Sequence, residues 1–181
     1  MIRIESSGLQ TSIQDSGRFY YRKFGVPCSG AMDVFSAQLA NSLLGNAADE
    51  AVMEFAYTGP TLFFHESVTI ALSGADFKVR CGEVLVPLNK PFLLPQNSVL
   101  RIGSAGKGVY GYLAIKGGFK TPKVLGSRSF YKEITEKSKF EEGDVLEINL
   151  PTQQISSKAS IKFEPLTSTQ RISVFSGPEF E

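Results

Sequence analysis

Short runs rich in β-branched and aromatic residues recur along most of the chain and are separated by turn residues. Glycine and proline mark the boundaries, as at Gly59-Pro60 and Gly117-Gly118. Regular spacing of short strands is typical of an antiparallel β-barrel or β-sandwich, so the pattern predicts a mainly β protein. The predicted strands lie at 2–5, 51–57, 61–64, 68–73, 77–80, 84–88, 99–102, 109–115 and 145–149.

One segment has a helical period instead. Apolar residues recur at helical spacing between Val34 and Leu44, after Asp33 and before Gly45. Aspartate is a good N-cap, and glycine is the usual residue just beyond a helix C-terminus. The sequence therefore predicts one short helix near residues 34–44. Its N-terminus carries the positive end of the helix dipole, which favours an anionic ligand.

The composition changes after Leu150. Residues 151–170 (PTQQISSKASIKFEPLTSTQ) are rich in Ser, Thr, Gln and Lys and read as a linker. Residues 171–181 (RISVFSGPEFE) read as a strand and a turn without a partner strand in the sequence. We expect a β domain at 1–150, a linker at 151–170, and the start of a truncated second half at 171–181.

Charge and composition narrow the possible functions. The 19 basic and 18 acidic residues leave a net charge of +1, too little to recruit nucleic acid or an anionic membrane. The chain shows neither a signal peptide nor an apolar run that spans a bilayer, so we expect a cytoplasmic protein. His65 is the one histidine, and Cys28 and Cys81 stand far apart, so no metal site is expected.

The stretch QDSGRFYYRKFGVPCSGAMD, residues 14–33, follows neither a helical nor a strand period. Its polar side chains suit a small polar carbonyl compound, and Gly17, Gly25 and Gly30 allow the backbone to approach a ligand closely. A structural ion pair is the alternative reading of a carboxylate near an arginine. The candidate ligand-binding residues are Gln14, Asp15, Arg18, Ser29 and Asp33.

Two carboxylates outside this stretch are further candidates. Glu54 lies in the middle of a predicted strand, where its side chain faces either solvent or an interior cavity. Asp76 follows Gly74-Ala75 at a tight turn, where it either accepts local amide hydrogen bonds or belongs to a site. The segment GSAGKG (103–108) lacks the spacing of a phosphate-binding loop, and we expect a hairpin connection there.

Several motifs occur together in a characteristic order: IQDSGR, FGVPCSGAMD, ANSLLGNAADEAVMEFAYTGPTLFF, IALSGADF, GYLAIKGGF and VLGSRS. In this order the chain resembles the allophanate hydrolase subunit 2 or KipA-like family. That family includes the C subunit of 5-oxoprolinase and biotin-dependent carboxyltransferase regions of urea carboxylase. The resemblance covers residues 2 to about 130. The segment FYKEITEKSKFEEGD replaces the family's glycine-rich segment, so the loop after Ser129 is expected to be remodelled.

The resemblance implies a cyclophilin-like β-barrel and a place in a complex. The implied partners are two further chains, one KipI-like and one LamB/YcsF-like. Together the three chains open 5-oxoproline to glutamate at the expense of ATP. The chain itself carries no nucleotide motif, so no cofactor is expected on it and ATP is expected to be used by the complex. The VLGSRS motif alone adds Ser127, Arg128 and Ser129 to the expected substrate-binding residues, beside Gly30.

The leading hypothesis is therefore the N-terminal part of the KipA-like component of a 5-oxoprolinase, which acts on a small amide or carboxylate and is inactive alone. Arg18 would stabilise an oxyanion, and Asp15, Glu54 and Asp76 would carry protons or orient groups. One alternative is biotin-dependent carboxyl transfer, with biotin on a separate carrier. Another is a non-enzymatic regulatory module that binds a KipI-like kinase inhibitor.

Overall fold

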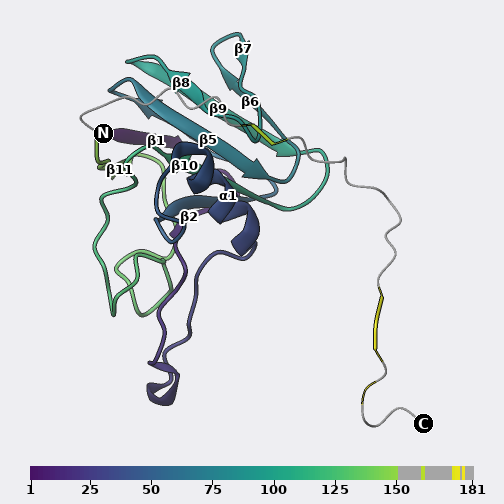
Figure 1. Ribbon diagram of the computed structural model, residues 1–181. Helices are drawn as coiled ribbons and strands as arrows, with labels where there is room; N and C mark the ends of the chain where they lie inside the picture. Colours follow the sequence, from purple (N-terminus) through teal and green to yellow (C-terminus); the bar gives the residue numbers. More distant parts are fainter. Residues whose placement is uncertain (151–159, 162–172, 176, 178–181) are drawn as a thin grey trace.

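The strands form two antiparallel sheets in the computed structural model, which describes residues 1–150, 160–161, 173–175 and 177 (Figure 1). The first sheet has the order β11-β1-β4-β9-β6-β7. Its strands are β1 (Ile2–Ser6), β4 (Thr61–Phe64), β6 (Phe77–Cys81), β7 (Val84–Leu85), β9 (Ser98–Ala105) and β11 (Val145–Leu146). The second sheet has the order β2-β3-β10-β5-β8. Its strands are β2 (Gln10–Gln14), β3 (Val52–Ala56), β5 (Val68–Gly74), β8 (Phe92–Leu94) and β10 (Tyr110–Ile115).

The mainly β architecture with one short α-helix is confirmed, and its strands form two sheets that do not close into a barrel. Two strands lie outside the predicted runs. Strand β2 has the sequence QTSIQ, in which apolar and polar residues do not alternate. Its buried residues Thr11, Ser12 and Gln14 are polar, so the hydrophobic pattern does not predict this strand. Gln14 therefore ends a strand, and the irregular stretch begins only after it. The other unpredicted strand, β8, is short.

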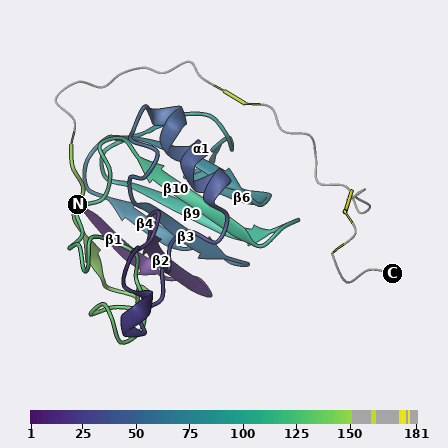
Figure 2. The ribbon, with the colours of Figure 1, turned by 60° about the horizontal axis from the view of Figure 1, so that its bottom comes forward.

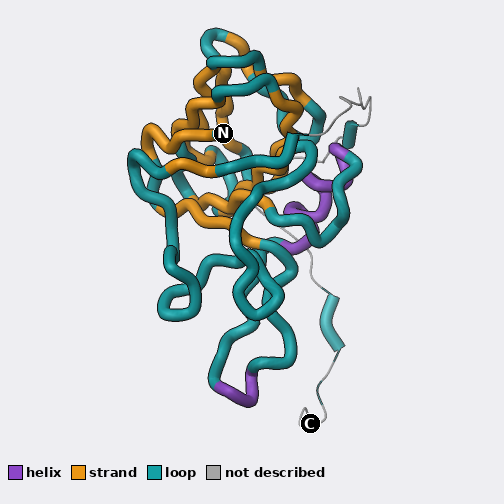
Figure 3. Tube along the Cα trace, turned by 90° about the vertical axis from the view of Figure 1, so that its left-hand side faces the viewer, coloured by secondary structure: helices purple, strands orange, loops and turns teal. Residues whose placement is uncertain are grey.

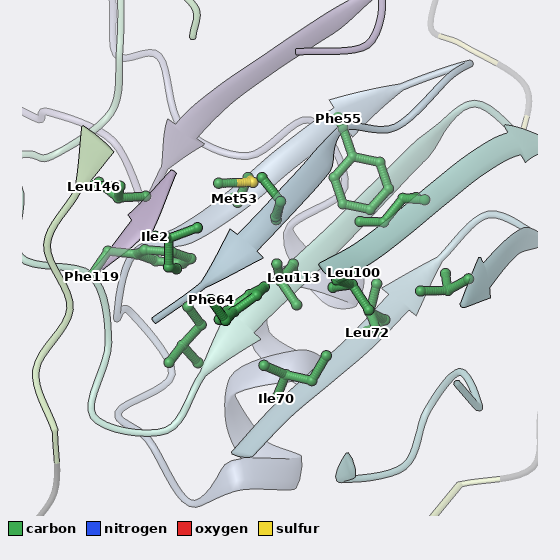
Figure 4. Packing of buried hydrophobic residues seen from close by; sticks show 14 of the residues in the cluster. Ile2, Met53, Phe55, Phe64, Ile70, Leu72, Leu100, Leu113, Phe119 and Leu146 are labelled. Atoms are coloured by element: carbon green, nitrogen blue, oxygen red, sulfur yellow. The ribbon is translucent and has the colours of Figure 1, made fainter. Parts of the chain in front are cut away.

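The main hydrophobic core lies between the two sheets (Figure 4). Ile2, Phe64 and Leu100 from the first sheet meet Leu72 and Leu113 from the second. All five side chains are almost fully buried, and each contributes roughly 1.5–3 kcal/mol of transfer free energy. The second sheet therefore packs on the core with one face, and its other face is free to carry further elements.

Helix α1 (Val34–Leu44) packs on that outer face, against β5 and β10 (Figure 2). The predicted helix is confirmed together with both of its end signals. The Asp33 carboxylate accepts a hydrogen bond from the Ser36 amide at 3.0 Å, and Gly45 adopts a left-handed conformation with φ of 63°. The protein's own carboxylate thus occupies the helix N-terminus, where an anionic ligand was expected.

Three further expectations concern the GSAGKG segment, membrane-spanning helices and the domain boundaries. Residues 103–105 of the GSAGKG segment end β9, and residues 106–108 begin the connection to β10. These strands belong to different sheets, so the hairpin prediction is wrong. No helix in the described part of the chain is both long and apolar enough to cross a membrane. The predicted linker at 151–170 and terminal strand at 171–181 fall largely outside the described residues, so the domain boundaries stay predictions.

Candidate functional site

The segment between β2 and α1 is a long loop that extends away from the sheets (Figure 3). A single 3-10 turn, η1 (Arg22–Phe24), lies at its tip. The two limbs of the loop meet near the sheet, where the Arg18 amide donates to the Cys28 carbonyl at 2.7 Å and the Ala31 amide donates to the Asp15 carbonyl at 3.0 Å. The base of the loop is therefore held by backbone hydrogen bonds.

Glycines make this close approach possible. Gly17 has φ of 91°, and a Cβ there would lie 2.6 Å from the Cys28 carbonyl oxygen. Gly30 has φ of 99°, and its Cβ would lie 3.1 Å from the Asp15 carbonyl oxygen. Both positions require a left-handed backbone and the absence of a side chain. The two glycines thus serve the crossing of the limbs.

The Asp15 carboxylate ties this loop to the segment 127–129. It accepts hydrogen bonds from the Ser127 hydroxyl at 2.6 Å, the Ser129 hydroxyl at 2.7 Å and the Arg128 amide at 2.6 Å. The Gly17 amide donates a fourth bond at 2.7 Å. Three of these donors share Oδ1 and one binds Oδ2, so most of the acceptor capacity of the carboxylate is used within the protein.

Burial works to raise the pKa of Asp15, but these hydrogen bonds outweigh it and hold the pKa below the ordinary value of 3.8. A carboxylate that stays ionised this firmly is a poor proton carrier at neutral pH. Its geometry instead suits a structural anchor between two loops.

Arg18 completes the anchor. The side chain is 1% exposed, and its guanidinium donates to the Ser29 hydroxyl, the Ser129 carbonyl and the Val124 carbonyl. Burial lowers the pKa of Arg18, which the charge of Asp15 partly offsets. Because the guanidinium is enclosed and already bonded to three oxygens, it does not face an open binding site. We call Asp15, Arg18, Ser29, Ser127 and Ser129 the loop anchor.

A second polar group crosses the outer face of the second sheet. The strand register places Ser12, Glu54, Tyr112 and Ser73 side by side on β2, β3, β10 and β5. Met53 and Phe55, on either side of Glu54, are buried in the core. Glu54 therefore lies on the outer face of the sheet, beneath the end of the long loop, and does not point into the interior of a barrel.

Glu54 and Tyr112 hold the start of α1. The Tyr112 hydroxyl donates to Glu54 Oε2 at 2.8 Å and accepts from the Asp33 amide at 2.7 Å. The Met32 amide donates to the same Glu54 oxygen at 2.7 Å. We call Glu54, Tyr112 and the amides of Met32 and Asp33 the Glu54 cluster.

The electrostatics of this cluster are opposite to those of the loop anchor. Burial raises the pKa of Glu54 above its ordinary value of 4.5, and the charge of Asp33 adds to this, against the lowering effect of the two hydrogen bonds. Burial and the neighbouring carboxylates also raise the pKa of Tyr112 well above 10, so the phenol stays a donor.

The two oxygens of Glu54 differ in their hydrogen bonds. The bonds from Met32 and Tyr112 both reach Oε2, and Oε1 has no partner among the described residues. A proton on Oε1 would be available to a ligand.

The remaining predicted residues lie apart from these two groups or serve their surroundings. Gln14 donates to the Ser12 hydroxyl at 2.9 Å, while its buried Oε1 has no partner among the described residues. The Arg128 side chain turns away to the Thr121 carbonyl. Asp76 is exposed and follows the end of β5 that pairs with the start of β10, so it lies at the opposite end of the second sheet from the loop anchor.

Sequence reasoning missed Tyr112 and Ser12. A tyrosine inside the apolar strand YGYLAI needs a hydrogen-bond partner for its hydroxyl, and this was the available signal. Which partner it would find depends on the strand order, which the sequence pattern does not give.

The family model for the carboxyltransferase domain, subdomain A and B, matches residues 24–181. The chain belongs to this carboxyltransferase domain family. The match includes Glu54, Tyr112 and the segment 127–129, although it begins after Asp15 and Arg18.

Relatives of this carboxyltransferase-family chain include urea amidolyases and C subunits of 5-oxoprolinase. Urea amidolyase of Saccharomyces cerevisiae is 40% identical over 131 residues, which is 72% of this chain and 7% of that protein. The C subunit of Escherichia coli 5-oxoprolinase is 28% identical over 184 residues, which is 99% of this chain and 59% of that protein. The chain thus spans only part of each relative.

Solved structures agree with the fold. The crystal structure of TTHA0988 superposes with a TM-score of 0.85 and 33% sequence identity, covering 92% of this chain and 34% of that chain. This agreement supports the two-sheet arrangement on which both polar groups are built.

Proposed function

We propose that this chain is part of the KipA-like component of a 5-oxoprolinase, which with partner chains opens the cyclic amide 5-oxoproline to glutamate. The observation that carries the chemistry is the Glu54 cluster, a half-buried carboxyl with a raised pKa and one oxygen without a partner among the described residues. The similarity to the C subunit of E. coli 5-oxoprolinase along 99% of this chain supports the choice of reaction.

The geometry suggests a role for Glu54 as general acid. Opening a lactam breaks the ring C–N bond, places a water-derived oxygen on the carbonyl carbon and requires a proton on the departing nitrogen. Protonated Glu54 would deliver that proton from Oε1, while Tyr112 and the Met32 amide hold Oε2 in place. The raised pKa keeps a larger fraction of the carboxyl protonated than in a free glutamate.

The loop anchor would act indirectly. It fixes residues 29–33 at one end, and Met32 and Asp33 of the same segment contact the Glu54 cluster. Asp15 and Arg18 are therefore positioning residues in this proposal, with Ser29, Ser127 and Ser129 as their partners. Gln14 would offer its unpartnered buried oxygen to an N–H of the substrate.

In this proposal, ATP is used by the complex and is not bound by this chain alone. The glycine-rich segment 103–108 ends β9 and leads to another strand, not into a helix, which is unlike a phosphate-binding loop and supports this assignment. ATP would be bound by a partner chain. The proposed partners are a KipI-like chain and a LamB/YcsF-like chain; relatives named as one subunit of an enzyme support the existence of partners.

Biotin-dependent carboxyl transfer is the second candidate. The 40% identity to S. cerevisiae urea amidolyase and the carboxyltransferase family model favour it. In that case the same outer face would receive a carboxyl group carried on biotin by a separate domain, and Glu54 would exchange the proton of the accepting nitrogen.

The test is turnover in a complex reconstituted from the full-length KipA-like polypeptide and both partner chains. Glu54→Gln should reduce ATP-dependent glutamate release by roughly 100-fold or more, since general acid catalysis contributes at least that much. Activity of the wild type should fall as pH rises through the raised pKa of Glu54, because the acid acts in its protonated form.

Two further variants sharpen the result. Tyr112→Phe removes a hydrogen bond that lowers the pKa of Glu54, so the alkaline limb of activity should move to higher pH. Glu83→Gln, at an exposed turn, is the matched control and should leave turnover unchanged. Wild-type glutamate release by Glu54→Gln would reject the assignment, and biotin-dependent carboxylation without glutamate release would favour the second candidate.

A further inference from the structure

The tip of the long loop exposes an unusual set of side chains. Phe19 is 53% exposed, Tyr20 91% and Phe24 70%. Arg22 and Lys23 are exposed beside them, and the Lys23 ammonium lies 5.0 Å from the centre of the Phe24 ring. We call these five residues the aromatic tip. Burial of large aromatic side chains is favourable, so three exposed ones within residues 19–24 require an explanation.

The tip is presented by a rigid base. The loop anchor and the crossing at Gly17 and Gly30 hold both limbs at the sheet, and η1 ends at Gly25 in a left-handed conformation. Tyr20 also has a left-handed backbone, with φ of 72°, and this places its ring in solvent. A tyrosine in this region is energetically unfavourable, which is typical of positions kept for function. The side chains are thus exposed by a preorganised backbone.

We propose that the aromatic tip is the docking element for a partner chain of the same enzyme, which receives Phe19, Tyr20 and Phe24 in an apolar pocket with an acidic rim. This inference rests on the proposed function, which supplies the KipI-like chain as the partner. Aromatic residues and arginine are the residue types that dominate binding energy at protein interfaces. A preorganised loop loses little conformational entropy on docking.

Charge and position favour this partner over others. Arg22 and Lys23 are too few to bind a nucleic-acid backbone strongly, and the net charge of the chain is only +1. They would instead complement carboxylates around the pocket. The loop that carries the tip also supplies the Met32 and Asp33 amides at its base, which donate to Glu54 and Tyr112, so a partner seated on the tip would contact the same loop that holds the proposed acid.

The test measures binding without turnover. The tagged full-length KipA-like polypeptide is co-expressed with the KipI-like chain, and the affinity of the purified pair is measured by biolayer interferometry. The double variant Tyr20→Ser/Phe24→Ser should weaken binding by roughly tenfold or more. The double variant Tyr57→Ser/Leu93→Ser is the control, because Tyr57, just after β3, is also exposed with a positive φ of 59°, and Leu93 is exposed on β8.

Each outcome decides the proposal. Loss of binding in the tip variant, with an unchanged melting temperature and an unaffected control, supports it. Equal affinity of wild type and tip variant overturns it, as does an absence of wild-type binding to the KipI-like chain. A wild-type homodimer that the tip variant abolishes would assign the tip to a second copy instead. Because binding is measured apart from glutamate release, tip-dependent binding in an inactive complex would reject the proposed reaction and leave the docking surface standing.

Discussion

Asp15 and Glu54 show how local surroundings give the same chemical group opposite properties. Both carboxyl groups are partly removed from water, which by itself raises a pKa. Asp15 receives four hydrogen bonds and has a lowered pKa, whereas Glu54 receives two and lies near Asp33. The Asp15 carboxylate is therefore suited to a structural role, and the Glu54 carboxyl is suited to carrying a proton.

The role of Asp15 as an anchor predicts a pH-dependent stability. Because its folded pKa is depressed, its contribution is fully present above the ordinary value of 3.8 and is lost as pH falls through the lower folded value. Asp15→Asn should lower the free energy of unfolding by about 2 kcal/mol at pH 7, since buried donors lose a charged acceptor. The difference from wild type should shrink below pH 3.8.

Urea denaturation at several pH values measures this. Asp49→Asn, at an exposed position, serves as the control and should behave as wild type throughout. A constant difference between Asp15→Asn and wild type across the acidic range would show that the charge of Asp15 does not stabilise the fold.

The elements differ in how well local sequence predicts them. Helix α1 follows from its apolar period, Asp33 and Gly45, because each signal lies within or beside the helix itself. Strand β2 does not, since its buried Gln14 donates to the Ser12 hydroxyl of the same strand and to the Phe130 carbonyl, which lies far along the chain. The alternation of apolar and polar residues predicts a strand only when its buried residues are apolar, so it does not predict a strand with buried polar residues.

The candidate site is predictable only in part for the same reason. The stretch 14–33 is recognisable by composition, but Ser127 and Ser129 lie more than a hundred residues away from Asp15 in the sequence. The family motif VLGSRS predicts Ser127 and Ser129 as site residues, whereas their spacing from Asp15 in the sequence does not predict them. Tyr112 was missed because its partner Glu54 lies on another strand, at a register that only the three-dimensional structure gives.

The crossing of the loop limbs gives a prediction at the level of the element. Gly17→Ala should destabilise the protein by more than about 1 kcal/mol, since the added Cβ meets the Cys28 carbonyl and the backbone is left-handed. Gly25→Ala at the tip has a similar φ of 79° but no atom within 4 Å of the new Cβ. It should cost about 1 kcal/mol or less.

Thermal melting of both variants separates the two effects. Equal losses would mean that backbone strain alone matters and that the close approach at Gly17 is unimportant. A larger loss at Gly17 supports the crossing as a structural requirement of the loop.

At the scale of the whole molecule, the core between the two sheets predicts cooperative unfolding. Leu72→Ala should lower the free energy of unfolding by about 2–5 kcal/mol, because the side chain is enclosed by both sheets. Leu93→Ala, at an exposed position on β8, should change it by less than about 0.5 kcal/mol.

Far-ultraviolet circular dichroism and tyrosine fluorescence should give coincident transitions for wild type and both variants. Two separate transitions would show that the sheets unfold independently and that the shared core does not join them into one cooperative unit.

The bonds from Met32 and Asp33 to the Glu54 cluster have a thermodynamic consequence. Since the covered carboxyl has a higher proton affinity than a hydrated one, the position of this segment and the protonation of Glu54 are linked. Because burial raises the pKa of Glu54 more than the Met32 hydrogen bond lowers it, a ligand or protein that lifts the segment should shift Glu54 towards proton release, and one that presses it down should shift Glu54 towards proton uptake. Calorimetric titrations in buffers of different ionisation enthalpy would count those protons directly, so association itself would report the state of Glu54.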